Sequence, residues 1–145
     1  EYILDNHVHS DIVQIPYSVF DRRFEELFPE TKKRGIEIHA RSIFLQGIVF
    51  KNSETIVKEP LNILRNKVKS LQDISSRIGV SVSNICTAFA ERNKYLDNIL
   101  VGVDSLENLN EILRYKEKKE IILENYEELL KLKENNESVL LPFNW

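Results

Sequence analysis

At 145 residues, the chain is long enough for one domain with its own core but short of the about 250 residues of a complete eight-stranded α/β barrel. It is 42% hydrophobic and 30% charged, as soluble globular proteins are, and its net charge of −3 gives no electrostatic basis for binding nucleic acid or an anionic membrane. No apolar run approaches the ~20 residues of a membrane span. The single cysteine, Cys86, excludes a disulfide within the chain, and we expect a cytoplasmic protein.

Short apolar runs alternate with amphipathic stretches along the first part of the chain. Residues 12–16 and 36–40 are compact apolar runs that predict strands buried in a parallel sheet. Between them, residues 22–33 have helical character, and Pro29 predicts a short turn followed by a new helical segment. Gly35 is placed to end that helix in a left-handed conformation. The alternation predicts an α/β class with parallel strands.

The middle of the chain is predicted to be mostly helical. Residues 44–58 are expected to form a loop with a β-rich patch. Pro60 opens a long run of apolar residues at helical spacing, which Gly79 ends. Ser81 or Ser83 is expected to cap the helix that follows.

A third strand is predicted at residues 99–101, followed by two more helices. Asp104 has the place of a helix N-cap, with Glu107 three positions on, as in a capping box. Residues 116–133 predict one long, highly charged amphipathic helix whose charges form a solvated face. The apolar tail, residues 140–145, is expected to dock against the rest of the protein.

Three segments, each a strand followed by a polar turn, carry a resemblance to a known family. They are DIVQIPYS at 11–18, GIEIHARSIFLQG at 35–47 and ILVGVDSLE at 99–107. In order and in residues they resemble the C-terminal half of an aldo/keto reductase. The resemblance implies a partial (β/α)8 TIM barrel in which residues 1–145 supply strands 6–8 with their helices. It also implies that the N-terminal half is absent from this chain.

The same resemblance implies a set of cofactor contacts for NADPH or NADH. Gln14 would contact the nicotinamide amide, and Ser42 with the backbone of 43–46 would meet the pyrophosphate. Arg41 replaces the aromatic ring that stacks on the nicotinamide. The cofactor-binding positions implied are Gln14, Arg41, Ser42, Ile43, Phe44, Leu45, Gln46, Gly102, Asp104 and Asn108.

The turn after the third strand departs from the family pattern. The family binds the adenosine 2′-phosphate through a lysine or arginine, whereas residues 102–112 contain no cation. Asn108 and Ile112 stand where an arginine and an asparagine often occur. This departure weakens the case for selecting NADPH through its phosphate. Asp104 could accept a hydrogen bond from a ribose hydroxyl, although its role as a helix cap is the favoured one.

Several of these residues also have structural explanations. Gln14 could be an interior polar residue bonded to a neighbouring strand, and Arg41 could pair with a carboxylate from the absent half. Tyr17 is expected to pack at a strand end, and Cys86 to be a small core residue. The Asp, Tyr, Lys and His that catalyse the family's reaction belong to the first half of the barrel, so no catalytic residue is assigned here.

The three histidines do not predict a metal site. His7 and His9 form a His-x-His pair, but no third ligand is evident in the sequence. His39 falls on the same side of its strand as Arg41, and it is expected to be a hydrogen-bonded residue of the barrel interior.

The resulting functional hypothesis is an NAD(P)H-dependent oxidoreductase that reduces a carbonyl substrate. Substrate binding would need the missing half, and an N-terminal half-barrel or another chain would cover the exposed strand edges. No nucleic acid or membrane partner is expected. Two alternatives remain open: a non-enzymatic binding or regulatory module derived from a half-barrel, and another phosphate-binding TIM-barrel enzyme.

Overall fold

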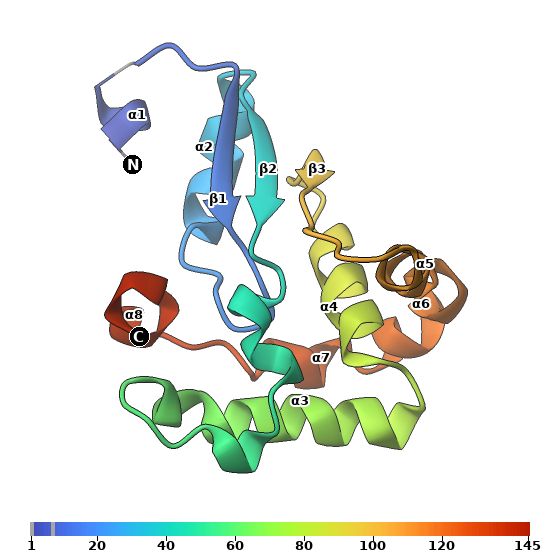
Figure 1. Cartoon of the computed structure of the whole chain (residues 1–145). Helices are drawn as coiled ribbons and strands as arrows, with labels where there is room; N and C mark the ends of the chain where they lie inside the picture. Colours follow the sequence, from blue (N-terminus) through green and yellow to red (C-terminus); the bar gives the residue numbers. More distant parts are fainter. Residues whose placement is uncertain (1, 7) are drawn as a thin grey trace.

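The computed structural model describes residues 2–6 and 8–145 and contains a three-stranded parallel sheet. The strands are β1 (Ile12–Pro16), β2 (Glu37–Arg41) and β3 (Asn98–Ile99), in the order β1-β2-β3 (Figure 1). The predicted α/β class with parallel strands is thus confirmed. The third strand is shorter than predicted, because the chain leaves the sheet once the Leu100 N–H has donated to the Ala40 carbonyl, at 2.8 Å.

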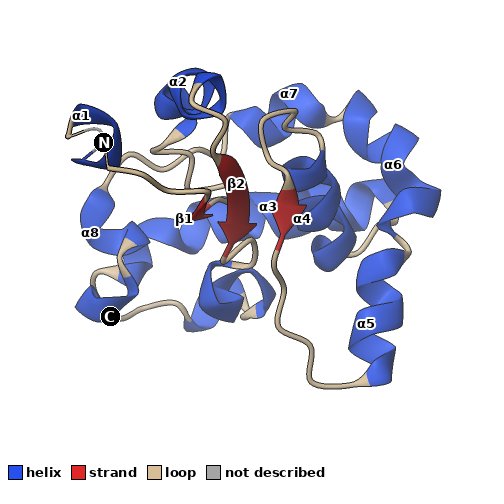
Figure 2. Ribbon diagram, turned by 90° about the horizontal axis from the view of Figure 1, so that it is seen from above, coloured by secondary structure: helices blue, strands red, loops and turns tan. Residues whose placement is uncertain are grey.

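Helices make up most of the remaining chain and lie around the strands (Figure 2). The α-helices are α1 (Tyr2–Asp5), α2 (Phe28–Lys33), α3 (Arg65–Ile78), α4 (Val82–Glu91), α5 (Leu106–Leu113), α6 (Tyr115–Glu124), α7 (Tyr126–Leu130) and α8 (Glu137–Leu140). Five short 3-10 helices are η1 (Glu25–Leu27), η2 (Leu45–Phe50), η3 (Ser53–Thr55), η4 (Leu61–Leu64) and η5 (Pro142–Asn144). None of the helices described is long and apolar enough to cross a membrane.

The two faces of the sheet differ in polarity. Ile38 and Ala40 of β2 are buried in the core cluster. The opposite face carries a row of register partners, Gln14, His39 and Asn98. His39 Nε2 lies 2.9 Å from Asn98 Nδ2 and 3.0 Å from Glu37 Oε2. The alternation predicted for β2 and the hydrogen-bonded state of His39 are therefore confirmed.

The core is centred on α4, in which residues 83–90 are all buried. Phe89 lies between two tyrosines, with ring centroids 6.0 Å from Tyr17 and 5.3 Å from Tyr126. The Tyr17 hydroxyl donates to Glu25 Oε1 at 2.8 Å and accepts from Asn93 Nδ2 at 3.0 Å. Burial raises the pKa of Tyr17 above its ordinary value. The predicted packing roles of Tyr17 and of Cys86, which is buried in α4, are confirmed.

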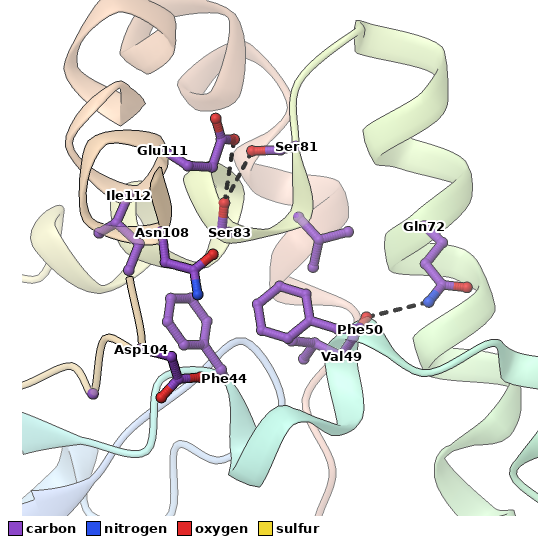
Figure 3. A pocket seen from close by; sticks show the side chains of 12 residues that line it. Phe44, Val49, Phe50, Gln72, Ser81, Ser83, Asp104, Asn108, Glu111 and Ile112 are labelled. Atoms are coloured by element: carbon purple, nitrogen blue, oxygen red, sulfur yellow. Dashed lines mark hydrogen bonds between the residues drawn. The ribbon is translucent and has the colours of Figure 1, made fainter. Parts of the chain in front are cut away.

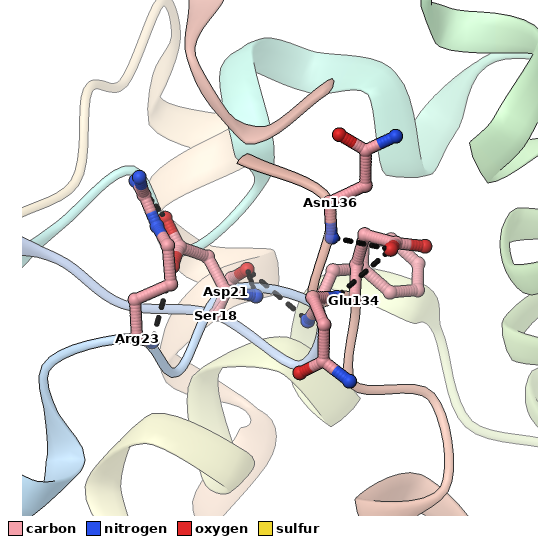
Figure 4. Close-up of polar contacts among 7 residues, drawn as sticks. Ser18, Asp21, Arg23, Glu134 and Asn136 are labelled. Atoms are coloured by element: carbon pink, nitrogen blue, oxygen red, sulfur yellow. Dashed lines mark hydrogen bonds and ion pairs between the residues drawn. The ribbon is translucent and has the colours of Figure 1, made fainter. Parts of the chain in front are cut away.

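A polar network fixes the turn after β1 and joins it to the C-terminal region (Figure 4). The Ser18 hydroxyl accepts from the backbone N–H of Asp21 at 2.9 Å, and the buried Asp21 carboxylate receives two hydrogen bonds from the Arg23 guanidinium and one from the Arg23 backbone N–H. The backbone N–H of Glu134 donates to the Phe20 carbonyl at 2.8 Å. The paired oxygens of Asp21 match the guanidinium fork, which makes this turn rigid.

Two helices end at the glycines that were predicted to end them. Gly35 follows α2 with φ 73°, and Gly79 ends α3 with φ 65°, both in the left-handed region that glycine tolerates. Ser81, rather than Ser83, caps α4 by accepting from the Asn84 N–H at 3.3 Å. Pro29 lies in the first turn of α2, after the short turn of η1, as predicted.

Three predicted elements are wrong in detail. Residues 44–58 contain η2 and η3 and no strand. Pro60 opens the 3-10 helix η4 rather than an α-helix, and α3 begins only at Arg65. The single helix predicted at 116–133 is broken at Asn125, where the backbone ψ of 11° lies outside the helical range. The side-chain amide of Asn125 donates to the Ile121 carbonyl at 2.8 Å. A side chain that bonds a nearby backbone carbonyl competes with the helical pattern.

The C-terminal tail packs on the core, as expected. Val139 and Leu140 are buried in α8, and the Trp145 indole N–H donates to the Val139 carbonyl at 2.9 Å. Phe143, by contrast, is exposed.

Candidate functional site

The turn that follows β2 has an unusual backbone. Ser42, Leu45 and Gln46 have φ values of 59°, 43° and 53°, and Gly47 has 80°. Phe44, with φ −99°, comes directly before Leu45, so right-handed and left-handed conformations succeed each other. Within this turn the Leu45 N–H donates to the Ser42 carbonyl at 2.8 Å and the Gly47 N–H to the Phe44 carbonyl at 2.9 Å, so these two donors are used inside the turn. Buried Ile43 anchors the turn in the core.

The turn that follows β3 leads into α5. Ser105 is the N-cap of α5, because its hydroxyl accepts from the Asn108 N–H at 3.1 Å. The prediction that Asp104 caps this helix is therefore wrong. Asp104 is instead exposed in the turn, two residues after Gly102. Because the serine makes the cap, the carboxylate of Asp104 is left to face a cavity.

Two adjoining cavities lie where these turns meet. The strand-end cavity, of about 680 Å³, is lined by Arg41, Ser42, Ile43, Phe44, Gln46, Gly47, Phe50, Leu100, Val101, Gly102 and Asp104. The helix-side cavity, of about 550 Å³, is lined by Phe44, Val49, Phe50, Gln72, Ser81, Val82, Ser83, Gly102, Asp104, Asn108, Glu111 and Ile112. Four residues line both cavities, so the two adjoin: Phe44, Phe50, Gly102 and Asp104.

Aromatic and polar side chains face each other in the helix-side cavity (Figure 3). The rings of Phe44 and Phe50 have centroids 5.2 Å apart. Across from them, Glu111 of α5 accepts from Asn84 Nδ2 at 3.2 Å and from the Ser83 hydroxyl at 3.4 Å. Both donors belong to the first turn of α4, so the contact between α4 and α5 fixes the carboxylate.

The η2 segment that carries Phe50 is itself held in place. Gln72 of α3 donates its side-chain amide to the Lys51 carbonyl at 2.8 Å and to the Val49 carbonyl at 3.2 Å. Val49 and Ile48 are buried. The aromatic wall of the cavity is thus fixed to α3 rather than carried on a free loop.

The charges of the two cavities differ. In the strand-end cavity, Arg41 contributes a guanidinium, and its Nη1 donates to the Ser42 hydroxyl at 3.3 Å. In the helix-side cavity the ionisable lining residues are Asp104 and Glu111, with no lysine or arginine in its lining. The combined site therefore holds the Arg41 guanidinium beside the sheet, the Asp104 carboxylate in the lining of both cavities, and the Glu111 carboxylate beside α5.

Most of the residues predicted to bind a cofactor come together here. Arg41, Ser42, Ile43, Phe44, Gln46, Gly102 and Asp104 line the strand-end cavity, and Asn108 lines the helix-side cavity. Leu45 is 2% exposed and packs in the core, so only its backbone lies near the site. Gln14 lies apart, on the exposed face of β1, and it contributes to a separate, largely apolar cavity of about 170 Å³ between β1 and α2.

Among the lining residues that sequence reasoning did not assign to the site are Phe50, Gln72 and Glu111. The helical spacing of α5 could have found Glu111, which lies three positions after Asn108 and so on the same face. Phe50 and Gln72 carry no such signal, because they reach the site through the fold of η2.

The histidine pair is only partly described by the structure. His7 lies outside the described residues, and His9 is exposed. Within residues 2–6 and 8–145, no group of three or more His, Cys, Asp or Glu side chains could hold a metal ion.

A comparison with protein families connects this arrangement to known proteins. The model of the aldo/keto reductase family matches residues 2–134, which is most of the chain. No curated protein matches the chain as a relative. Because the family match extends from α1 to the segment after α7, and so includes all three strands and both turns of the site, the chain belongs to the aldo/keto reductase family, a family of oxidoreductases.

Proposed function

We propose that this chain is the cofactor-binding, C-terminal half of an NAD(P)H-dependent reductase of carbonyl compounds. In this proposal β1, β2 and β3 are strands 6, 7 and 8 of a (β/α)8 TIM barrel. The observation that carries the proposal is the meeting of the turns after β2 and β3 around two adjoining cavities. Functional sites of such barrels lie at the carboxyl ends of the strands, and phosphate often binds after strands 7 and 8.

The residues present fit a dinucleotide. The strand-end cavity offers the Arg41 guanidinium and the Ser42 hydroxyl, which suit a pyrophosphate, and we propose that backbone N–H groups of 43–46 other than that of Leu45 add to them. The helix-side cavity offers the faces of Phe44 and Phe50, which suit a purine ring. NADPH or NADH, when bound, supplies the hydride that reduces the carbonyl.

In this proposal, the role of this chain in the reaction is to bind the dinucleotide and to orient its nicotinamide ring. Arg41, at the carboxyl end of β2, has a planar guanidinium that can stack on a flat ring while neutralising a phosphate. Gln14 is the proposed partner of the nicotinamide amide, since an amide side chain both donates and accepts. Its side chain shares a sheet face with His39, on the side that an enclosed barrel would turn inward.

The acid that protonates the carbonyl oxygen must come from outside these strands. In the described part of the chain, β1 and β3 each pair with β2 alone, which leaves an edge on each side of the sheet. We propose that an N-terminal half-barrel, or another chain, pairs with these edges and contributes the catalytic residues and the pocket for the carbonyl substrate.

The proposal is tested on the intact protein as it occurs in its source, whose mass and N-terminus are determined first. Oxidation of NADPH and NADH is then followed by absorbance with small aldehydes and ketones as substrates. Reduction that is lost in Arg41→Gln and Ser42→Ala supports the proposal. Dinucleotide binding without reduction of any carbonyl would favour a binding module, and a lack of dinucleotide binding would refute the cofactor site itself.

A further inference from the structure

The helix-side cavity is acidic, and its acidity distinguishes the two nicotinamide dinucleotides. We infer that this cavity, through Glu111 and Asp104, selects NADH over NADPH by accepting the unphosphorylated adenosine ribose and repelling a 2′-phosphate. The inference rests on the proposed function and names the cofactor that the site takes.

The direction in which a dinucleotide lies follows from the two cavities. The reacting end must reach the carboxyl ends of the strands, where Arg41 and Leu100 line the strand-end cavity. The other end then extends past Phe44 and Phe50 into the helix-side cavity. Figure 3 shows Phe44 and Phe50 on one side of this cavity and Asn108 and Glu111 of α5 on another, and in this inference the adenosine part lies between them.

Glu111 is fixed in a way that suits recognition of hydroxyl groups. Asn84, which is 5% exposed, donates to Glu111 Oε1 at 3.2 Å, and the Ser83 hydroxyl donates to the same oxygen at 3.4 Å. The second carboxylate oxygen keeps its capacity to accept. Its neighbour Arg114 has Nη1 3.8 Å from Glu111 Oε2, but this guanidinium is exposed and does not line the cavity. An exposed ion pair such as Arg114–Glu111 contributes little binding energy, so it does not neutralise Glu111.

A 2′-phosphate would meet unfavourable charge in this cavity. It carries roughly −1.5 to −2 charges at neutral pH and requires cationic donors. The cavity instead presents Asp104 and Glu111, separated by the neutral Asn108. A ribose hydroxyl, in contrast, can donate to either carboxylate. A site that pairs with a hydroxyl and repels the phosphorylated analogue discriminates by charge as well as by hydrogen bonding.

The test measures dissociation constants of NADH and NADPH for the intact protein by isothermal titration calorimetry. We expect NADH to bind about tenfold tighter or more, as like-charge contacts in a binding site predict. Glu111→Gln keeps an oxygen that can accept from Ser83 and Asn84 but removes the negative charge. It should therefore lower the ratio of the NADPH to the NADH dissociation constant severalfold. Asn108→Arg adds a cation to the cavity and should raise NADPH affinity. Glu117→Gln, an exposed change on α6 outside the cavity, should leave the ratio unchanged.

The possible outcomes separate this inference from the proposed function. NADPH binding as tight as NADH, or tighter, overturns the inference and leaves the dinucleotide site standing. An unequal ratio that Glu111→Gln and Asn108→Arg both fail to change also overturns it, because the selectivity then arises elsewhere. If neither dinucleotide binds, the proposed function fails and the inference fails with it.

Discussion

The Ser105 hydroxyl accepts a hydrogen bond from the backbone N–H of Asn108, at 3.1 Å. This contact begins α5 and thereby sets the direction of the helix that carries Asn108 and Glu111 into the helix-side cavity. It also leaves Asp104, one residue earlier, without a capping role. The Ser105 side chain therefore marks where α5 begins, and both Asp104 and Glu111 line the helix-side cavity.

Replacing Ser105 by alanine removes the cap and is expected to lower the free energy of unfolding by about 1 kcal/mol. Asp104→Ala, the matched control, should change it by less than about 0.5 kcal/mol, as other surface substitutions do. Urea denaturation followed by circular dichroism measures both variants. A larger loss in Asp104→Ala than in Ser105→Ala would restore Asp104 as the cap and contradict the structure.

The features of the fold that the sequence predicts well are those with local causes. Gly35 and Gly79 end helices because each occupies a backbone conformation that other residues avoid. β1 and β2 were predicted within a residue of their bounds, because each carries apolar residues between polar turns. The burial expected for both strands is only partial, since Ile12, Gln14, Glu37 and Arg41 are exposed. In each case the signal lies in the residues that form the element.

The features that sequence reasoning missed depend on tertiary contacts. The apolar residues of 44–58 suggested a β-rich patch, but in the fold Leu45, Ile48 and Val49 form the buried face of η2, and the Val49 carbonyl accepts from Gln72 of α3. The charged stretch 116–133 has helical periodicity throughout, and its interruption falls at Asn125, whose side-chain oxygen accepts from Arg77 of α3 at 3.1 Å. Asp104 and Ser105 are both good caps by type, and only the geometry of the turn chooses between them.

For the candidate site, the sequence predicts the two turns but not their surroundings. Arg41 ends β2, and Ser42 and Asp104 lie in the turns after β2 and β3; all three were identified as candidate site residues through the family resemblance. The walls of the helix-side cavity come from segments distant along the chain, and Glu111 is fixed by the first turn of α4. No local pattern could indicate that α4 and α5 meet.

Glu134 provides a prediction about pH. Burial alone would raise the pKa of its carboxyl, but the Lys67 ammonium, 2.8 Å away, and the N–H groups of Asn135 and Asn136 hold the pKa below the ordinary 4.5. Because the folded pKa is the lower one, the contribution of this carboxylate is present above pH 4.5 and is lost as the pH falls through the folded pKa.

Glu134→Gln is therefore expected to cost about 1–2 kcal/mol of unfolding free energy at neutral pH and much less in acid. Urea denaturation at several pH values measures this difference. The exposed Glu127→Gln, on α7, serves as the control and should follow the wild-type curve at each pH. A loss in Glu134→Gln that stays constant down to the lowest pH would show that packing, rather than the ionised carboxylate, is responsible.

Gly79 and Gly102 form a matched pair that isolates backbone strain. A Cβ added at either position meets nothing within 4 Å, so crowding does not distinguish them. Gly79 has φ 65°, whereas Gly102 lies outside the left-handed region. Gly79→Ala is expected to cost about 1 kcal/mol, and Gly102→Ala close to nothing. Equal losses in thermal denaturation would mean that conformation is not the cause.

The burial of Cys86 predicts that its thiol reacts slowly with thiol reagents in the folded protein. It is 1% exposed on α4, and burial raises the pKa of its thiol to about 12. Because the thiolate is the reactive form, a disulfide reagent at neutral pH should label Cys86 only as fast as the protein opens. In concentrated urea the same reagent should react at the rate of a free cysteine. Destabilised variants such as Gly79→Ala should be labelled faster than the wild type, provided that opening is reversible. The labelling rate should rise by the same factor as the unfolding equilibrium constant of the variant. Labelling of the native protein as fast as that of the unfolded chain would show that α4 is not the closed centre of the core.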